Sequence, residues 1–322
     1  MLVLNPEQTD GLHLCLASLP TKARARLETL IPKCTVAAFE GAPHWDFELS
    51  AKKVDEIIGS GPDDLKTAKL RRAMIASWLL ELPRRIAAYN LPPEVLSQYP
   101  HWITRTVEYL AEQTQAYDPD HWAKDVRFAL GLSVPGSKTH MIDLSSPVGL
   151  GQPVKHVLDG HGFAPPLRWF LASGWGVWLE IHTESRDLAD FNPEGWDKAW
   201  LALAEIVRRY SGLKGGIGSS WFYDPPLTQI SPRLAYLRKT PLKYGAFMVH
   251  QGTGAIHTQR AAASSPTRRE LIDAGKYTPR SWLMVWPRAE LLRWADKEKK
   301  RQDDLADIIA KAEETGSTDN PA

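Results

Sequence analysis

Cysteine is scarce in this sequence of 322 residues, which contains only Cys15 and Cys34. Two cysteines exclude a disulfide-rich scaffold, and because they form no Cys-x-x-Cys pair, they exclude a cysteine-based zinc site of that type as well. The simplest interpretation is that both are small apolar side chains, buried or half-buried in a core.

An excess of charge of one sign is also missing. The 39 Lys and Arg residues balance 38 Asp and Glu residues to a net charge of +1, which excludes a generally basic nucleic-acid binder. No run of about 18 uninterrupted apolar residues occurs, so we expect no transmembrane helix and no membrane partner. The first residues lack the basic start and apolar run of a secretory signal, which predicts a cytoplasmic protein.

The signatures of several enzyme classes are absent. There is no His-Glu-x-x-His zinc motif, no Gly-x-Ser-x-Gly nucleophile elbow, and no Gly-x-Gly-x-x-Gly turn after a strand. The segment GLKGGIGSS (212–220) looks like a phosphate-binding loop, but Gly218 precedes Ser219 where that loop requires lysine. The segment also follows a helix rather than opening one, so we predict a helix end, a turn and a strand.

The periodicity of apolar residues predicts a mixed α/β fold. Near residue 130 the pattern changes from helical to a mixture of helices and strands. We expect a mainly helical N-terminal part (1–130), an α/β domain with a mostly parallel or mixed sheet that carries the site (131–298), and a charged C-terminal helix with a frayed tail (299–322). The extended segments of the second part are 130–135, 139–145, 174–184, 215–224, 244–251 and 281–288.

One helix of the second part has especially clear signals. Asn192 is suited to cap its start, and Pro193 suits the first helical position. Trp196, Trp200 and Leu203 follow at helical spacing, so these side chains should face the core.

Three ionisable residues alternate in the extended segment GVWLEIHTES. The strand period of two places Glu180, His182 and Glu184 on one face. A carboxylate–imidazole–carboxylate row suits a general base held by a neighbour, or a metal site completed by His250 or His257. The remaining alternative is a solvated strand end with a structural histidine.

Downstream segments combine hydroxyl groups, arginines and aromatic rings. Helix starts at Ser231-Pro232 and Ser265-Pro266 offer N–H groups to an anion, and a nearby guanidinium adds a bidentate partner. Plain helix capping with solvated arginines is the alternative. The residues predicted to bind a small anionic substrate are Ser219, Ser220, Trp221, Asp224, Ser231, Arg233, Ser265, Thr267, Arg268 and Arg269.

Parts of the chain resemble known proteins. The segments 221–238, 264–288 and 191–196 are similar to those of a group of uncharacterised bacterial hypothetical proteins, with the resemblance spanning roughly residues 120–295. No activity is assigned to that group, so it transfers no catalytic residue.

The order of elements from 174 to 288 is similar to the second half of the GNAT acyltransferase fold. Strands and helices alternate, and a Gly-Lys-Tyr turn (275–277) precedes the last strand. This resemblance implies acyl transfer with acyl-CoA as the donor. The GNAT family binds the CoA pyrophosphate with an R/Q-x-x-G-x-G/A motif after its fourth strand, whereas the corresponding segment here, HTESRDLADFNPEG (182–195), lacks that motif.

Together these patterns predict an enzyme that acts on a small anionic molecule by GNAT-like acyl transfer. His182 or Glu184 would be the base, and Tyr223 or Tyr277 the acid. A metal-dependent enzyme using His182, Glu184 and His250 is the second hypothesis, and a non-catalytic binding or scaffold protein is the third. Acyl-CoA is the candidate cofactor, and homo-oligomerisation is left open.

Overall fold

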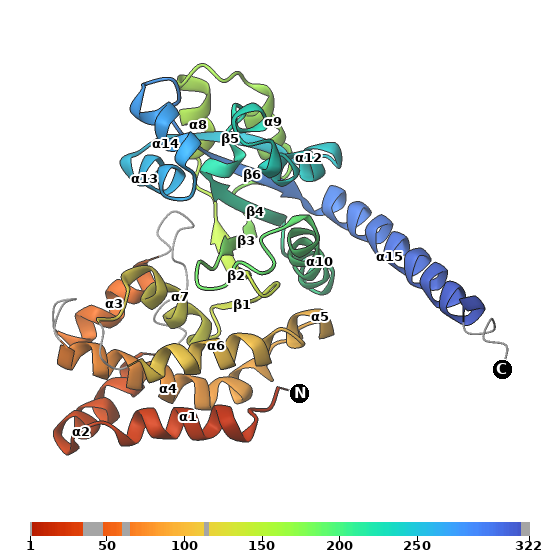
Figure 1. Ribbon diagram of the computed structural model, residues 1–322. Helices are drawn as coiled ribbons and strands as arrows, with labels where there is room; N and C mark the ends of the chain where they lie inside the picture. The colour runs from red at the N-terminus through yellow and green to blue at the C-terminus, as the bar shows by residue number, and fades with distance from the viewer. Residues whose placement is uncertain (1, 35–47, 60–64, 113–115, 317–322) are drawn as a thin grey trace.

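The computed structural model describes residues 2–34, 48–59, 65–112 and 116–316 of the chain. Its first part is helical up to residue 130 (Figure 1). The elements are α1 (Pro6–Ala17), α2 (Thr21–Leu30), η1 (Ile31–Lys33), α3 (Leu49–Ile58), α4 (Leu65–Ile86), α5 (Pro93–Leu96), α6 (Tyr99–Ala111) and α7 (Pro119–Leu130).

Strands and helices alternate in the second part of the chain. The elements are β1 (Ser133–Pro135), β2 (His140–Pro147), α8 (Gly151–Leu158), α9 (Ala164–Leu171), β3 (Val177–Thr183), α10 (Pro193–Arg209), β4 (Gly215–Ser220), η3 (Trp221–Tyr223), α11 (Leu227–Ile230), η4 (Pro232–Leu234), α12 (Tyr236–Lys243), β5 (Phe247–Thr253), α13 (Ala255–Ala263), α14 (Pro266–Asp273), β6 (Arg280–Pro287) and α15 (Arg288–Gly316).

The strands form one six-stranded sheet in the order β1-β2-β3-β4-β6-β5. Each of the extended segments predicted from the sequence overlaps one of these strands, and the predicted mixed α/β fold is confirmed. The sheet is mixed, because β3 and β4 pair in parallel while the other neighbours are antiparallel. The predicted frayed tail beyond residue 316 lies outside the described residues.

Successive side chains of each strand point to opposite faces of the sheet, and both faces are buried. In β6, Leu283 and Val285 pack with Trp169 of α9 on one face, while Met284 and Trp286 join the large core on the other. That large core also contains the buried faces of α4, α6 and α7, so apolar packing is continuous between the helical part and the sheet. The domain boundaries given above remain predictions.

The parallel pair β3–β4 is short. Its register covers only Leu179↔Gly216 and Glu180↔Ile217, and the strands are not paired with each other beyond these residues. Glycine in β4 also allows close packing, because a Cβ at Gly216 would lie 2.7 Å from the ring of Trp200. The sheet is thus interrupted between its two central strands, and this interruption positions the cavity described below.

Helices α8 and α9 have apolar side chains on their outer faces. At helical spacing on α8 and its start, Leu150, Val154 and Leu158 are 62%, 56% and 80% exposed. On α9 and its start, Phe163 and Leu167 are exposed in the same way. These two helices are held to β5 by their other faces, so a surface rich in large apolar groups faces outward.

None of the described helices combines the length and apolar character that a membrane span would need.

The start of α10 allows a direct test of a helix cap that was predicted from the sequence. The Asn192 side-chain oxygen accepts a hydrogen bond from Gly195 N at 2.7 Å, which confirms the predicted cap. We expect Asn192→Ala to lower the free energy of unfolding by about 1 kcal/mol, because the buried N–H loses its partner. Urea denaturation measures this change. Asn192→Asp, which keeps the acceptor, should stay close to wild type, and an unchanged midpoint in Asn192→Ala would contradict the cap.

Candidate functional site

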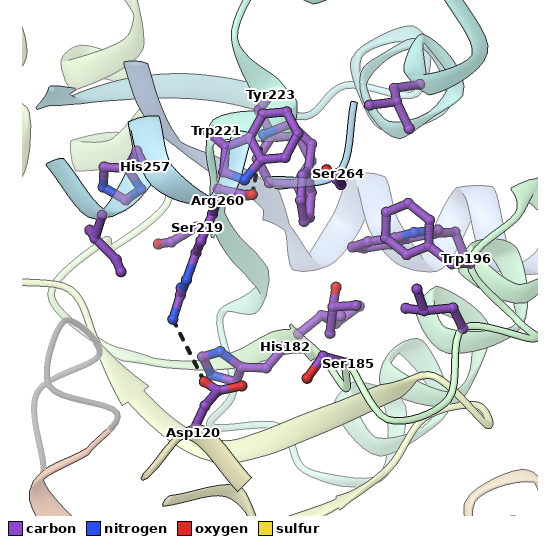
Figure 2. Close-up of a pocket in the computed structure, with 18 of the residues that line it drawn as sticks. Asp120, His182, Ser185, Trp196, Ser219, Trp221, Tyr223, His257, Arg260 and Ser264 are labelled. Atoms are coloured by element: carbon purple, nitrogen blue, oxygen red, sulfur yellow. Dashed lines mark hydrogen bonds and ion pairs between the residues drawn. The ribbon is translucent and has the colours of Figure 1, made fainter. Parts of the chain in front are cut away.

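A cavity of about 1130 Å³ lies between the helical part and the sheet. Its lining comes from α7, β3, β4, η3, the start of α10, and α13 (Figure 2). Aromatic and aliphatic side chains such as Trp196 and Trp221 share the wall with charged ones such as Asp120 and Arg260. A mixed lining of this size suits a small organic ligand with both apolar and charged groups.

The cavity occurs at the interruption of the sheet. His182 lies on β3 beyond its last pairing with β4, and Ser219 lies on β4 beyond the same point. Both side chains line the cavity (Figure 2). Because β3 and β4 no longer pair at this point, residues of both strands are accessible to a ligand in the cavity.

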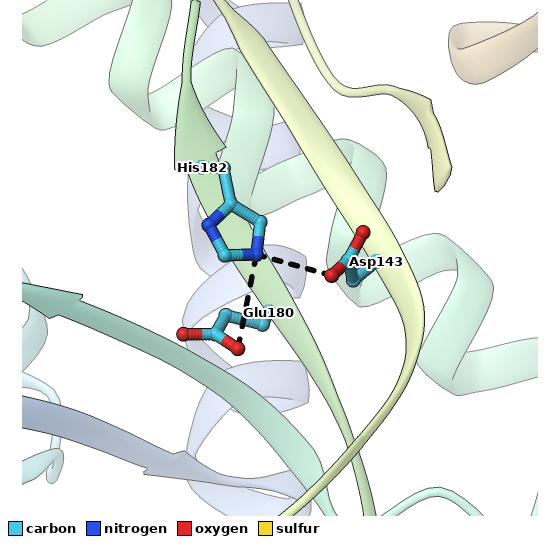
Figure 3. Close-up of side chains that lie close together, drawn as sticks. All are labelled: Asp143, Glu180 and His182. Carbon is cyan, nitrogen blue, oxygen red and sulfur yellow. Dashed lines mark hydrogen bonds and ion pairs between the residues drawn. The ribbon is translucent and has the colours of Figure 1, made fainter. Parts of the chain in front are cut away.

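His182 belongs to a compact ionisable cluster with Asp143 and Glu180 (Figure 3). Its Nε2 lies 3.1 Å from Asp143 Oδ2 and 3.7 Å from Glu180 Oε2. Asp143 of β2 and Glu180 of β3 are directly opposite each other in the sheet register, and both carboxylates are buried. Like charges at directly opposite positions destabilise a sheet unless cations compensate them.

Arg127 of α7 supplies one compensating charge. Its Nε lies 3.0 Å from Asp143 Oδ1 and its Nη2 lies 2.9 Å from Asp143 Oδ2, which is a bidentate pair. The Ser133 hydroxyl also donates to Asp143. Burial by itself would raise the pKa of Asp143, but Arg127 and then His182 outweigh it and lower that pKa to about 2. Asp143 is therefore a permanent anion at neutral pH.

His182 supplies the second compensating charge when it is protonated. Burial opposes the imidazolium, but Glu180 and then Asp143 outweigh burial and raise the pKa of His182 above its usual value. Because a carboxylate only accepts hydrogen bonds, Nε2–H donates to Asp143, and Nδ1 is then the basic nitrogen of the neutral ring. The arrangement is that of a carboxylate-held general base.

Tyr223, one of the two tyrosines predicted as acid, is brought to the same cavity. Its ring is buried, and its hydroxyl packs so closely on β4 that a Cβ at Gly218 would lie 2.8 Å from it. Burial, followed by the nearby charge of Glu180, raises the pKa of Tyr223 well above its usual range. The phenol therefore stays protonated at neutral pH and can donate a hydrogen bond.

The predicted metal set is not assembled. Among the residues that the structure describes, the group within reach of one ion is Asp143, Glu180 and His182. His250 instead lies against Asp159, with Nδ1 2.8 Å from Oδ2. An ion bound by the assembled group would compete with Arg127 for both oxygens of Asp143, so this donor set fits a proton better than a divalent cation.

Glu184 differs from its predicted position beside His182. Strand β3 ends at Thr183, so the alternation of side chains ends before Glu184. The Glu184 carboxylate is buried and bound by Arg186, with Nη2 2.8 Å from Oε2. Arg186 also binds Asp125 of α7 at 2.6 Å. Glu184 thus completes an ion network with the helical part, which leaves His182 as the base candidate of the pair.

Tyr277 and Asp224 also lie outside the cavity lining. The Tyr277 hydroxyl donates to Asp224 Oδ2 at 3.1 Å, and Arg280 Nε donates to Oδ1 at 3.1 Å. The Trp282 ring N–H also donates to Asp224 Oδ1, at 3.1 Å. A buried carboxylate needs such donors, so these residues satisfy one another.

The predicted substrate-binding residues divide into two groups. Ser231 lies behind the lining, where its hydroxyl accepts from Arg268, and Ser265 caps α14 through Arg268 N. The capping alternative therefore describes Ser265. Thr267 and Arg269 lie outside the cavity lining as well. The residues that do line the cavity are Ser219, Ser220, Trp221, Arg233 and Arg268.

Asp143 and Arg127 are the main site residues that sequence reasoning missed. An acid within the apolar segment THMIDLS was a usable signal for Asp143, because such a residue must find a partner when buried. No comparable signal marks Arg127, since its pairing with β2 depends on how α7 packs on the sheet. The charged cavity residues Asp118, Asp120, Lys124 and Arg260 were missed for the same reason.

Comparison with known proteins identifies the fold. No protein-family profile and no curated protein matches the sequence. Among solved structures, an acyltransferase in complex with CoA and 10C-teicoplanin aligns with a TM-score of 0.51 and 12% identity over 89% of this chain and 90% of that chain. An acyltransferase in complex with decanoyl-CoA and teicoplanin aligns with a TM-score of 0.53 and 13% identity over the same shares. The chain therefore shares its overall fold with these acyltransferases.

One prediction for this site concerns the charge on His182. Glu180→Gln removes a buried negative charge beside the imidazole and should lower the pKa of His182. Histidine titration by NMR measures this shift. Glu28→Gln on the exposed side of α2 is the control and should leave the titration unchanged. A pKa of His182 that stays constant or rises in Glu180→Gln would show that the cluster is not electrostatically coupled.

Another prediction concerns the contribution of Glu184 to stability. Glu184→Gln leaves Arg186 with less charge compensation in a buried network, so the free energy of unfolding should fall by about 3 kcal/mol. Urea denaturation compares it with Glu81→Gln, which breaks an exposed pair with Arg84 and should cost less than about 1 kcal/mol. Equal effects of the two substitutions would exclude a stabilising role for the Glu184 network.

Proposed function

We propose that this protein is a GNAT-like acyltransferase that moves an acyl group from acyl-CoA to a small acceptor. The proposal rests on His182, whose imidazole is held by a carboxylate. This side chain lines a large cavity at the point where β3 and β4 separate. Solved proteins of similar fold are described as acyltransferases in complex with CoA or decanoyl-CoA. Their likeness supports the class of reaction and leaves the substrates to be found.

The separated strands offer a binding edge for the donor. Beyond Glu180 and Ile217, the facing edges of β3 and β4 are not paired with each other. The pantetheine arm of CoA carries amide groups, which can form hydrogen bonds with such strand edges as a peptide does. An arm placed there would bring its thioester close to His182 and Ser219, which lie beyond the same point.

His182 would act as the general base. The neutral ring accepts the proton of the acceptor amine or hydroxyl as that nucleophile attacks the thioester carbonyl. Asp143 holds the tautomer through Nε2–H, and the two carboxylates stabilise the imidazolium that forms. As the carbon–sulfur bond breaks, the imidazolium would give its proton to the departing thiolate, and the Tyr223 hydroxyl would donate a hydrogen bond to the sulfur.

The pH dependence follows from the direction of the pKa shift. A base must be neutral to accept a proton, and the pKa of His182 is raised by Glu180 and Asp143 against burial. The transfer rate should therefore be low below that pKa and rise as the pH passes through it. The anionic character of the acceptor and the cytoplasmic location remain predictions from the sequence.

The test of this function is thiol release from acetyl-CoA and decanoyl-CoA with a panel of small amines and alcohols. His182→Gln should lower the rate by about 100-fold or more, because it removes the base while keeping a polar side chain of similar size. His13→Gln on the exposed side of α1 is the matched control and should leave the rate unchanged. If the wild-type protein neither binds CoA nor releases thiol from either donor, the proposed function is wrong.

A further inference from the structure

Arg268 of α14 is a buried cation at the wall of the cavity. Only 1% of its surface is exposed, yet the residue contributes to the cavity lining. Its Nε donates to the Ala261 carbonyl at 2.9 Å, Nη1 donates to Ser231 Oγ at 3.0 Å, and Nη2 donates to Ser264 Oγ at 2.7 Å. These three bonds leave part of the five-donor guanidinium fork available for another acceptor.

The charge of Arg268 lacks a compensating anion, in contrast to the charges of Arg71, Arg127 and Arg186. Arg71 pairs with Asp55 at 2.8 Å, and Arg127 and Arg186 are each bound to buried carboxylates. All the hydrogen-bond partners of Arg268 are neutral, and its guanidinium lies 4.8 Å from the ring centroid of Trp221. Within the described ranges, no carboxylate lies at ion-pair distance from it. A buried charge of this kind is costly unless a ligand completes it.

A second cation strengthens the positive field at this end of the cavity. Arg233 is exposed, lines the same cavity, and follows Ser231 by two residues in the chain. Burial, and then the charge of Arg233, lower the pKa of Arg268, so the two guanidinium groups repel each other. An anion between them would relieve this repulsion and accept hydrogen bonds from both.

We propose that Arg268 and Arg233 bind a phosphate group of the substrate. Phosphate suits the site because it offers several oxygens to two forked donors. The assignment of that phosphate to CoA rests on the proposed function. The alternative source is a phosphorylated acceptor, which would use the same chemistry.

The segment between β3 and α10 supports this placement. Its arginine, Arg186, already forms ion pairs with Asp125 and Glu184. The same segment and the first turn of α10 carry Asp187 and Glu194, which repel phosphate. A CoA phosphate in this cavity therefore finds its compensating charge at Arg268 and Arg233.

The first experiment uses inorganic phosphate and does not depend on acyl transfer. Thermal unfolding followed by circular dichroism, at constant ionic strength, should show stabilisation of the wild type by phosphate. Arg233→Gln and Arg268→Lys should each lose most of that stabilisation, because the first removes a charge and the second removes the planar fork. Lys239→Gln, which removes an exposed charge on α12 outside the lining, should behave as wild type.

The second experiment identifies the source of the phosphate by comparing the affinities of CoA and pantetheine. If CoA is the source, Arg233→Gln should weaken CoA binding about tenfold and leave pantetheine binding unchanged. Loss of phosphate stabilisation with unchanged CoA affinity would support the site and assign it to a phosphorylated acceptor. Equal phosphate stabilisation in wild type, Arg233→Gln and Arg268→Lys would overturn the proposal, whether or not thiol release is observed.

Discussion

The bidentate pair between Arg127 and Asp143 is the interaction on which the site depends. Asp143 faces Glu180 across the β2–β3 register, and two buried carboxylates in that position require cations. Arg127 provides one positive charge from α7, so the helical part completes the electrostatics of the sheet. His182 then binds to a carboxylate whose charge and orientation are already fixed. One helix thus both packs on the sheet and fixes the carboxylate that holds the candidate base.

The elements of the fold were accessible from local signals. A period of two identified the strand segments, and the caps and helical spacing identified α10 with Asn192 at its start. Local patterns also placed His182 on a strand. These successes share a cause, because each depends on residues close together in the sequence.

The remaining features depend on contacts between distant segments. Glu184 turns toward Arg186 and Asp125 because β3 ends one residue earlier, and no periodicity reports that end. Tyr277 belongs to the shell of Asp224, which lies 53 residues away in the chain. Likewise, His250 was a plausible metal ligand by residue type alone, while its actual neighbour is Asp159. The type of a residue suggests its role, but the packing of distant segments determines which partner its ionisable side chain contacts.

The apolar outer faces of α8 and α9 bear on how copies of this chain behave together. With a net charge of only +1, two copies experience almost no overall electrostatic repulsion. Leu158 and Phe163 would then meet little opposition to contact except the entropy lost on association. Changes of pH that move the net charge away from zero should therefore improve the solubility of the protein.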